Sequence, residues 1–300
     1  MRLVELPDGL GRAFSTKAAL EAGVHPARLR KVDLARPFHG VREIAPALTL
    51  EERCRTYAAR MRPDEFFCSA TAALLHEIPL PLDLEDDRRL HVAVPNPRRA
   101  PRSKGIIGHK FVVHPARGEV VEFSGLRVSS PERSWCELGA ILDTTDLVAA
   151  GDHLIRPANR LSSAARLRAT LERHPHKRTR ERLEAVFALL DPGAESPAES
   201  ALRVLLVRAG ISGFRSNLRV HVAGRMRRID LAHEDRMVAL EYQGDIHRDT
   251  RQWRADMTRI AELESVGWRV GYINADDMRD PDRLVARIRR LLAGDPPIHL

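Results

Sequence analysis

The sequence predicts an α+β protein that contains several domains. Its 300 residues are enough for two or three domains, at about 100–150 residues each. Helical and strand-like segments alternate without an internal repeat, and the Pro- and Gly-containing stretch 191–197 separates a regular C-terminal part from what precedes it. These observations divide the chain into four predicted segments: 1–50, 51–158, 159–190 and 191–300.

The first segment is predicted to be a winged helix-turn-helix domain. A helix over Lys17–Ala22 ends at Gly23, which supplies the turn. A second, basic helix is expected over Pro26–Ala35, and residues 37–42 read as a turn and a short strand. This layout is typical of a winged helix-turn-helix. The side chains that the second helix would present to DNA are Arg28, Arg30 and Lys31.

The second segment is predicted to be a mixed α/β domain, and the third a basic helical connector. Helices are expected over Leu50–Met61 and Ser69–His76, and another begins at Ser130 with a proline at its first position. Strands are expected at residues 91–94, 111–113 and 120–123. Between the first two strands, Pro97–Gly105 forms a basic, flexible loop that is a candidate contact for phosphate.

The C-terminal segment has the most regular pattern, and its predicted order is α-β-β-β-α-β-α. The expected helices are Ser196–Gly210, Thr250–Val266 and Pro281–Ala293. The expected strands are Phe214–Val222, the two arms of a hairpin over Met226–Gly244, and Gly267–Ile273.

Composition limits the partners and the compartment. The net charge of +8 fits a polyanionic partner. The cysteines, Cys54, Cys68 and Cys136, are far apart and odd in number, which indicates neither a disulfide framework nor a zinc site. The start of the chain lacks the apolar core of a signal peptide, and no apolar run approaches the roughly 18 residues of a membrane span. We therefore expect a soluble, cytoplasmic protein without a membrane partner.

Two acids in the predicted hairpin are the main candidates for chemistry. A turn about Asp235-Arg236 places Asp230 directly opposite Glu241, on a face that also carries alanines and Gln243. The other face then carries Ile229, Leu231, Val238, Leu240 and Tyr242. Carboxylates this close repel each other unless a cation lies between them, and a divalent metal ion is the usual cation. The hairpin therefore predicts a site that can hold Mg²⁺ against a phosphodiester.

These acids also carry a resemblance to a known family. Glu199, Asp230 and Glu241-Tyr242-Gln243, in this order of elements, resemble the PD-(D/E)XK nuclease superfamily. The run from Glu241 to His247, with Asp256-Met257-Thr258-Arg259 and Leu263, is similar to the Vsr-like endonuclease domains, which are related to very-short-patch repair endonucleases. The resemblance covers residues 190–295. It implies a restriction-endonuclease-like fold and a metal-dependent endodeoxyribonuclease, a hydrolase of DNA phosphodiester bonds.

A second resemblance covers the first 150 residues. They resemble AbiEi-type antitoxin proteins, in which a winged-helix domain, here Gly11–Arg42, precedes a mixed domain with a run like Ser129-Ser130-Pro131-Glu132-Arg133. This resemblance implies DNA binding, and it implies a protein partner such as a toxin or another defence or repair component.

The nuclease resemblance assigns roles to particular residues. Asp230 and Glu241 would bind Mg²⁺, or Mn²⁺ as the alternative metal ion, and Arg259 would contact the phosphate. The superfamily usually has lysine two residues after the second acid, where this chain has the uncharged Gln243. An antitoxin-like transcriptional regulator with a catalytically inactive nuclease fold is therefore the alternative. The implied catalytic residues are Glu199, Asp230, Glu241, Gln243 and His247.

Each of these residues also has a plain structural interpretation. The two acids of the hairpin would be a solvated face paired with Arg227 or Arg228, and Glu199 would complete a capping box with Ser196. His247 would be an ordinary surface histidine, and Arg259 would pair with Asp256 on its own helix. The basic residues near the N-terminus would be a solvated face.

Overall fold

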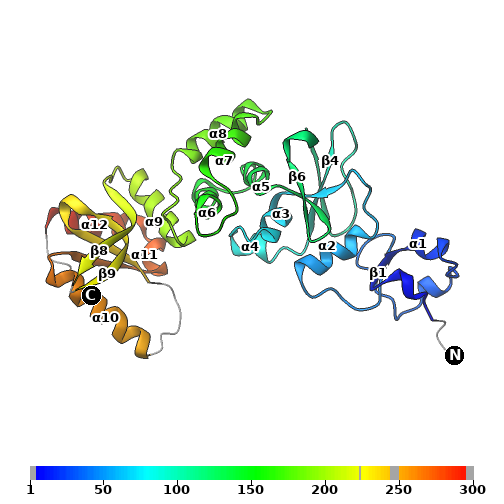
Figure 1. The fold of residues 1–300 in the computed structure, drawn as a ribbon, viewed down its shortest axis with the longest axis horizontal. Helices are drawn as coiled ribbons and strands as arrows, with labels where there is room; N and C mark the ends of the chain where they lie inside the picture. Colours follow the sequence, from blue (N-terminus) through cyan, green and yellow to red (C-terminus); the bar gives the residue numbers. More distant parts are fainter. Residues whose placement is uncertain (1–4, 223, 244–249, 295–300) are drawn as a thin grey trace. The chain divides into compact units, whose positions relative to one another are not determined.

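The structure, a computed structural model, describes residues 5–222, 224–243 and 250–294, with the side chains of Pro115 and residues 250–257 left out. It is an α+β protein with helices and both mixed and antiparallel sheets (Figure 1). The chain forms two compact units, Met1–Ile141 with Ala169–Arg180, and Leu142–Arg168 with Glu181–Leu300. None of the described helices is both long and apolar enough to cross a bilayer.

The N-terminal part of the first unit is a small helical subdomain with a two-stranded sheet. Strand β1 (Ala13–Ser15) pairs antiparallel with β2 (Val41–Glu43), and helix α1 (Thr16–Glu21) begins at the Ser15 cap, whose hydroxyl accepts a hydrogen bond from the Ala18 amide. Two short 3₁₀ turns, η1 (Asp8–Leu10) and η2 (Arg28–Arg30), complete it. Its core consists of Phe14, Ala19, Val24, Leu29 and Leu34.

The prediction of a second helix over Pro26–Ala35 is wrong. Within that range only the three residues of η2 are helical. Both leucines of the segment, Leu29 and Leu34, are buried, whereas Val32 is exposed. They are five positions apart, so a helix would point them in different directions. The chain buries both by turning instead, and Arg28 folds back onto Asp33 at 2.7 Å.

A mixed five-stranded sheet and its helices form most of the rest of the first unit. Its strands lie in the order β5-β4-β3-β7-β6. Their bounds are β3 (Phe66–Phe67), β4 (Leu90–Pro95), β5 (Ile106–Phe111), β6 (Val120–Phe123) and β7 (Leu126–Ser129). The helices are α2 (Leu50–Ala58), α3 (Ser69–Leu75), α4 (Leu82–Glu85) and α5 (Pro131–Leu138), with a 3₁₀ turn η3 (Pro115–Arg117). The strand predicted at residues 111–113 in fact ends at Phe111, because β5 pairs in parallel with β4 from Ile106 onward.

Three helices lie between the two sheets in the sequence: α6 (Thr144–Ile155), α7 (Ala164–Glu172) and α8 (Lys177–Phe187). The predicted boundary at residue 158 assigns α6 to the middle domain. In the structure α6 packs on α9 (Pro197–Arg208) through a buried ion pair, Asp152 to Arg203 at 2.6 Å. Residues 144–155 therefore belong with the C-terminal helix. The four predicted segments as a whole remain a prediction.

The C-terminal sheet has the strand order β11-β10-β9-β8. Its strands are β8 (Phe214–Val222), β9 (Arg225–His233), β10 (Val238–Tyr242) and β11 (Arg269–Ile273), with a 3₁₀ turn η4 (Glu234–Arg236) in the hairpin. The first three are antiparallel neighbours, and β11 runs parallel to β10. Helices α9 and α12 (Pro281–Ala293) pack on one face, and α10 (Thr250–Ser265) packs on the other (Figure 1). The predicted order of elements is present, with an additional short helix α11 (Ala275–Arg279).

The predicted pairing of the hairpin is confirmed. The ladder joins Val238 to His233 and Leu240 to Leu231, so one further step places Glu241 beside Asp230. Their position at the end of this ladder follows from the alternation and the turn that the sequence encodes.

The predicted faces of the hairpin are wrong at Ile229. This side chain packs with Ala232, Ala239 and Leu263 on the α10 face, whereas Leu231 packs on the α9 and α12 face. The ladder between β8 and β9 skips Asn217, which has a φ of 53°, and Asp230 opposite it. A left-handed residue rotates the side chains that follow it in β8, and β9 changes face at the position opposite, so the strict alternation expected of the strands breaks at this point.

Candidate functional site

Asp230, within β9, and Glu241, near the end of β10, lie side by side. The backbone amide of Tyr242 donates a hydrogen bond of 3.0 Å to Asp230 Oδ2, which holds that carboxylate against the neighbouring strand. The side chain of Glu241 is only 2% exposed. Two carboxylates thus meet at a largely buried position of the sheet.

The surroundings of both carboxylates disfavour their charged forms. Burial raises the pKa of Glu241 well above its usual range, and the charge of Asp230 raises it further. Burial also raises the pKa of Asp230, although the amide of Tyr242 and the charges of Arg259 and Arg228 oppose this shift. The pair is therefore electrostatically strained when both groups are ionised, and a cation relieves that strain.

One such cation belongs to the chain itself. Helix α10 directs Arg259 to the carboxylate pair, and its Nη2 lies 2.7 Å from Glu241 Oε2. Within the described part of the chain, neither oxygen of Glu241 accepts a hydrogen bond of good geometry, so the arginine acts on it mainly through charge. These buried oxygens keep acceptor capacity that a metal ion could use.

Glu199 lies in the first turn of α9, near the carboxylate pair. Its carboxylate accepts hydrogen bonds from the Glu195 amide at 2.9 Å, the Ser196 hydroxyl at 2.9 Å and the Asn217 side-chain amide at 3.2 Å. Its pKa is raised by burial first, and the charge of Asp230 contributes. Glu199 therefore stabilises the start of its helix, as the capping interpretation expected, and it lies within electrostatic range of Asp230.

The other predicted site residues have different positions. The backbone amide of Gln243 donates a 2.7 Å hydrogen bond to the Ile273 carbonyl, so the residue extends the parallel pairing of β10 with β11. Its side chain is half-buried. His247 lies outside the described residues, as does the side chain of Asp256. The partner of Arg259 that the structure does describe, Glu241, is a residue of the site.

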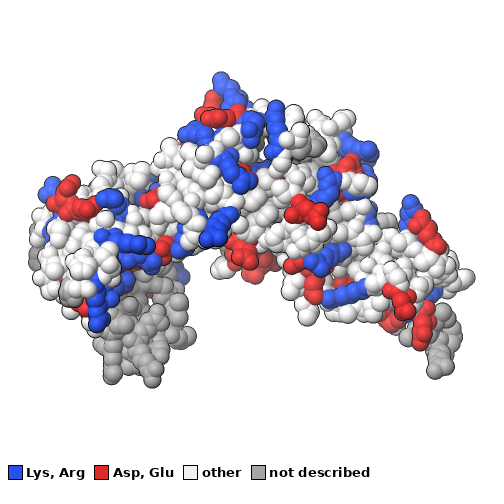
Figure 2. All heavy atoms as spheres, in the orientation of Figure 1, with Lys and Arg blue, Asp and Glu red and all other residues white. Residues whose placement is uncertain are grey.

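The predicted DNA-contacting residues do not share one helical face. Arg30 and Lys31 are exposed near η2. The prediction for Arg28 needs correction, because its side chain is only 10% exposed and is paired with Asp33. On the face drawn in Figure 2, basic side chains are interspersed with acidic ones and do not form one continuous patch.

The predicted arginine partners of the acidic pair are engaged elsewhere. Arg227 pairs with Glu262 at 2.5 Å, and Arg228 pairs with Glu195. Arg227 is therefore not a partner of the acidic pair, whereas the charge of Arg228 still acts on both acids. The role of Asn217 was not predicted. The sequence offers one indication of this role. Asparagine tolerates a left-handed conformation better than most residues, so an asparagine within a strand pattern can mark a break in it.

Oxygen donors of this kind suit Mg²⁺ or Mn²⁺ better than softer metals. Across residues 5–222, 224–243 and 250–294, no group of three or more His, Cys, Asp or Glu side chains converges as metal ligands. A metal ion held by the described side chains would therefore depend on Asp230 and Glu241, with water or backbone carbonyls as further ligands.

Comparisons with known proteins identify relatives of this chain whose functions are not described. No protein-family model matches the chain. The uncharacterized proteins Rv2248 and MT2308, from two strains of Mycobacterium tuberculosis, are each 29% identical to it over 231 residues, which covers 75% of this chain and 80% of the relative. The crystal structure of the RV2827C protein from the same species is similar over 71% of this chain and 85% of that chain, with 17% identity and a TM-score of 0.41.

Proposed function

We propose that the C-terminal unit carries a Vsr-like endonuclease domain of the PD-(D/E)XK superfamily that hydrolyses DNA phosphodiester bonds. One observation carries the proposal: Asp230 and Glu241 lie next to each other on two paired strands, and burial raises the pKa of both carboxyls although Arg259 lies against Glu241. The order of helices and strands agrees with it. In this proposal the N-terminal region is an AbiEi-like module that binds DNA in the cytoplasm, although the recognition helix expected of a winged helix is reduced to η2.

The roles of the residues follow from their positions. Asp230 and Glu241 would hold Mg²⁺ or Mn²⁺, which supplies charge neutralisation at the phosphate and a bound water of lowered pKa. Arg259 would exchange Glu241 for a phosphate oxygen when DNA enters, since a guanidinium binds both groups well. Gln243 would orient water through its side-chain amide. Glu199 would keep the helix start in place beside Asp230.

Cleavage of plasmid and single-stranded DNA in Mg²⁺ or Mn²⁺ tests the proposal. We expect metal-dependent cleavage by the wild-type chain and its loss in Asp230→Asn and Glu241→Gln. Asp235→Asn is the matched control, because Asp235 is an exposed acid in the same hairpin. Cleavage that survives Glu241→Gln unchanged would overturn the assignment of the site.

A second candidate function is an antitoxin-like, DNA-binding transcriptional regulator whose nuclease fold is inactive. The Glu241–Arg259 ion pair favours it, because the chain already places a cation against the acid. The uncharged Gln243 favours it too. This candidate predicts salt-sensitive DNA binding without cleavage, unchanged by Asp230→Asn, and a toxin or other defence or repair component as a protein partner.

A further inference from the structure

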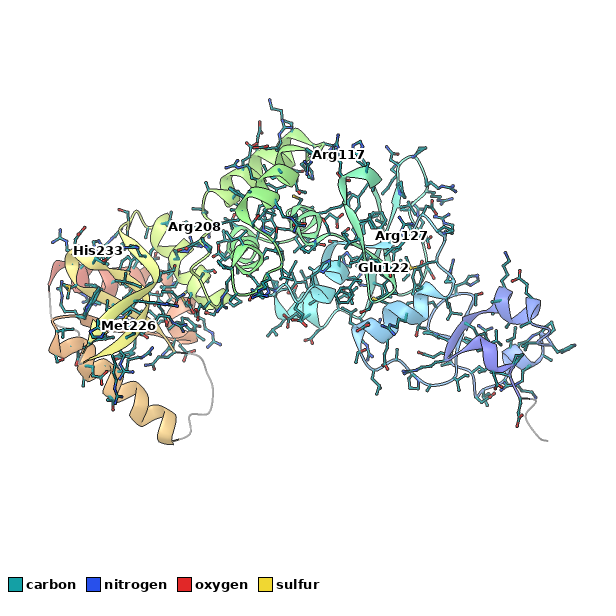
Figure 3. All side chains as sticks on the ribbon, in the orientation of Figure 1. Arg117, Glu122, Arg127, Arg208, Met226 and His233 are labelled. Carbon is teal, nitrogen blue, oxygen red and sulfur yellow. The ribbon has the colours of Figure 1, made fainter. Side chains whose placement is uncertain are left out.

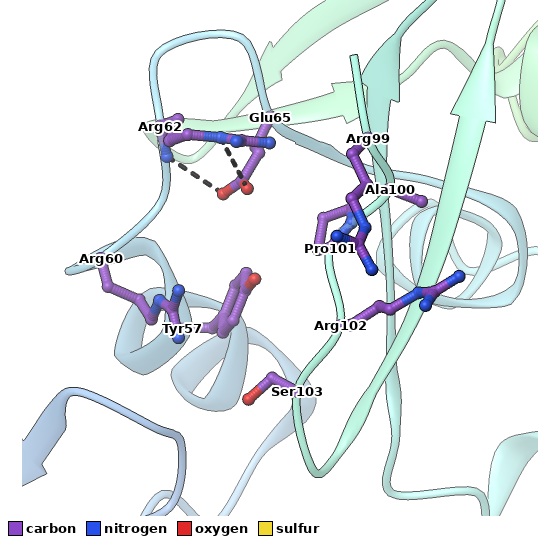
Figure 4. A pocket seen from close by; sticks show the side chains of 9 residues that line it. All are labelled: Tyr57, Arg60, Arg62, Glu65, Arg99, Ala100, Pro101, Arg102 and Ser103. Atoms are coloured by element: carbon purple, nitrogen blue, oxygen red, sulfur yellow. Dashed lines mark hydrogen bonds and ion pairs between the residues drawn. The ribbon is translucent and has the colours of Figure 1, made fainter.

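The first unit contains a pocket rich in arginine, of about 420 Å³. It lies between the end of α2 and the loop that joins β4 to β5 (Figure 4). Its volume falls within the range of roughly 300–1,000 Å³ that is usual for small-molecule sites. The lining residues that matter here are Tyr57, Arg60, Arg62, Arg99, Arg102 and Ser103.

The loop that forms one wall is anchored, although the sequence predicted it to be flexible. A Cβ atom on Gly108 would lie 1.9 Å from the carbonyl oxygen of Pro101, so the loop packs directly on β5 where no side chain intervenes. Arg98 pairs with Asp64 at 2.8 Å, and the Ser103 carbonyl accepts a hydrogen bond of 3.1 Å from the Ile106 amide. The basic side chains of this loop therefore project from a defined backbone.

The charges around the pocket are unbalanced. Four arginines line it against one carboxylate, Glu65, which is paired with Arg62 at 3.1 Å. Arg60 donates to the His39 carbonyl at 2.7 Å. Arg99 and Arg102 have no ion pair with any carboxylate that the structure describes. Like charges gathered in a concave site create a positive potential that attracts anions.

A buried hydroxyl adds hydrogen-bonding capacity to this charge. Ser103 Oγ is buried and has no hydrogen-bond partner among the described residues. In Figure 4 it points toward the side of the pocket formed by Tyr57 and Arg60, while Arg99 reaches down from the opposite wall. A buried hydroxyl without a partner costs free energy, which a ligand oxygen would recover once its entry displaces the atoms that cover Ser103 Oγ.

We propose that this pocket is a binding site for a phosphate-bearing ligand. Arginine forks match the geometry of phosphate oxygens, and the Ser103 hydroxyl can donate to one of them. The phosphate would come from a free polyphosphate compound or from the phosphodiester backbone of nucleic acid. The site belongs to the first unit and is separate from the carboxylate pair, so it does not depend on nuclease activity.

Binding of inorganic tripolyphosphate and of a short single-stranded oligo-dT to the full chain tests the proposal. Calorimetry gives the affinity, and thermal unfolding gives an independent measure, because a ligand that binds the folded state raises Tm. We expect at least one probe to bind, and its affinity to fall as salt increases. Arg99→Ala and Ser103→Ala should weaken binding, the former by about tenfold. Arg99→Lys should restore it in part, since lysine keeps the charge without the fork.

Arg127→Ala is the matched control, because Arg127 is an exposed arginine of the same unit that does not line the pocket (Figure 3). Tripolyphosphate binding that depends on Arg99 supports the pocket and identifies a free polyphosphate as the source. Oligonucleotide binding alone, with the same dependence, supports the pocket and identifies a phosphodiester. No binding of either probe at about 1 mM, or an equal loss in Arg127→Ala, would overturn the proposal. Circular dichroism of each variant verifies that the fold is retained.

Discussion

Arg259 and Glu241 form an ion pair across one face of the C-terminal sheet, with Nη2 and Oε2 2.7 Å apart. The arginine is 30% exposed and the carboxylate almost fully buried. Asp230 lies beside Glu241, and the charges of Arg259 and Arg228 only partly offset the burial that raises the pKa of both acids. A metal ion and the arginine are therefore alternative ways to stabilise the same carboxylates.

Removal of the arginine tests this relationship. Arg259→Met should destabilise the C-terminal unit by about 1–2 kcal/mol, because it leaves a buried carboxylate without its cation while part of the arginine is already in water. Mn²⁺ should stabilise this variant more than the wild type, as measured by urea denaturation in EDTA and in Mn²⁺.

Arg279→Met is the control for Arg259→Met, because its pair with Asp276 is exposed. We expect a change within about 0.5 kcal/mol for this control. Equal effects of Mn²⁺ on the wild type and on Arg259→Met would argue against a metal ion at the carboxylate pair.

Stability should depend on pH through Glu241. The pKa of Glu241 is raised in the folded chain, so the folded state holds this proton more tightly than the unfolded state does. The resulting contribution to the free energy of unfolding is complete below the usual carboxyl pKa of about 4.3, and it is lost as pH rises through the raised folded value. Glu241→Gln should remove this loss, and the variant should gain stability relative to the wild type between pH 5 and pH 8.5.

Urea denaturation at both pH values measures this gain, and Glu234→Gln, an exposed acid of the same hairpin, is the control. A difference between Glu241→Gln and the wild type that stays constant with pH would show that the carboxyl titrates in its ordinary range.

The ion pair between α6 and α9 should be important for stability. Asp152 is 1% exposed and accepts hydrogen bonds from Arg203 Nη2 at 2.6 Å, the Ser200 hydroxyl at 2.7 Å and the Asp191 amide at 2.6 Å. Asp152→Ala should cost about 3 kcal/mol, because it leaves a buried guanidinium with only the more distant carboxylate of Asp191, at 3.9 Å.

The exposed pair of Glu234 with Arg215 provides the comparison for Asp152. Glu234→Ala should cost less than about 1 kcal/mol. Chemical denaturation measures the free energy of unfolding of both variants. A cost below about 1 kcal/mol for Asp152→Ala would mean that α6 is not an integral part of this unit.

Alanine variants of Arg28 and of its neighbours Arg30 and Lys31 should differ in their effect on DNA affinity. Arg30→Ala and Lys31→Ala should weaken DNA binding and each lower the salt slope by about one, because each removes one phosphate contact. Arg28→Ala should leave affinity nearly unchanged and lower stability instead, since its guanidinium is committed to Asp33.

Fluorescence anisotropy across a salt series measures these DNA affinities, with Lys17→Ala as an exposed control on α1. If Arg28→Ala weakened DNA binding as much as Arg30→Ala, the Arg28–Asp33 pair would have to open in the complex.

Much of the C-terminal unit could be predicted because its signals are local. Strand β8 and helix α12 have the predicted bounds, and the hairpin register follows from alternation and a turn. Around Pro26–Ala35 a basic helix was predicted, but the chain turns there and buries both Leu29 and Leu34. Local composition and core packing disagreed there, and packing decided the structure.

The sequence by itself determined where the helices and strands of the C-terminal unit lie and that Asp230 meets Glu241, because both depend on periodicity and on nearest neighbours along a hairpin. Only the tertiary structure decided which cation faces these acids and which side Ile229 takes. The first depends on how α10 packs over the sheet, and the second on the break in the ladder where Asp230 lies opposite Asn217 of another strand. Such relations join residues that are distant in the chain, so no local pattern specifies them.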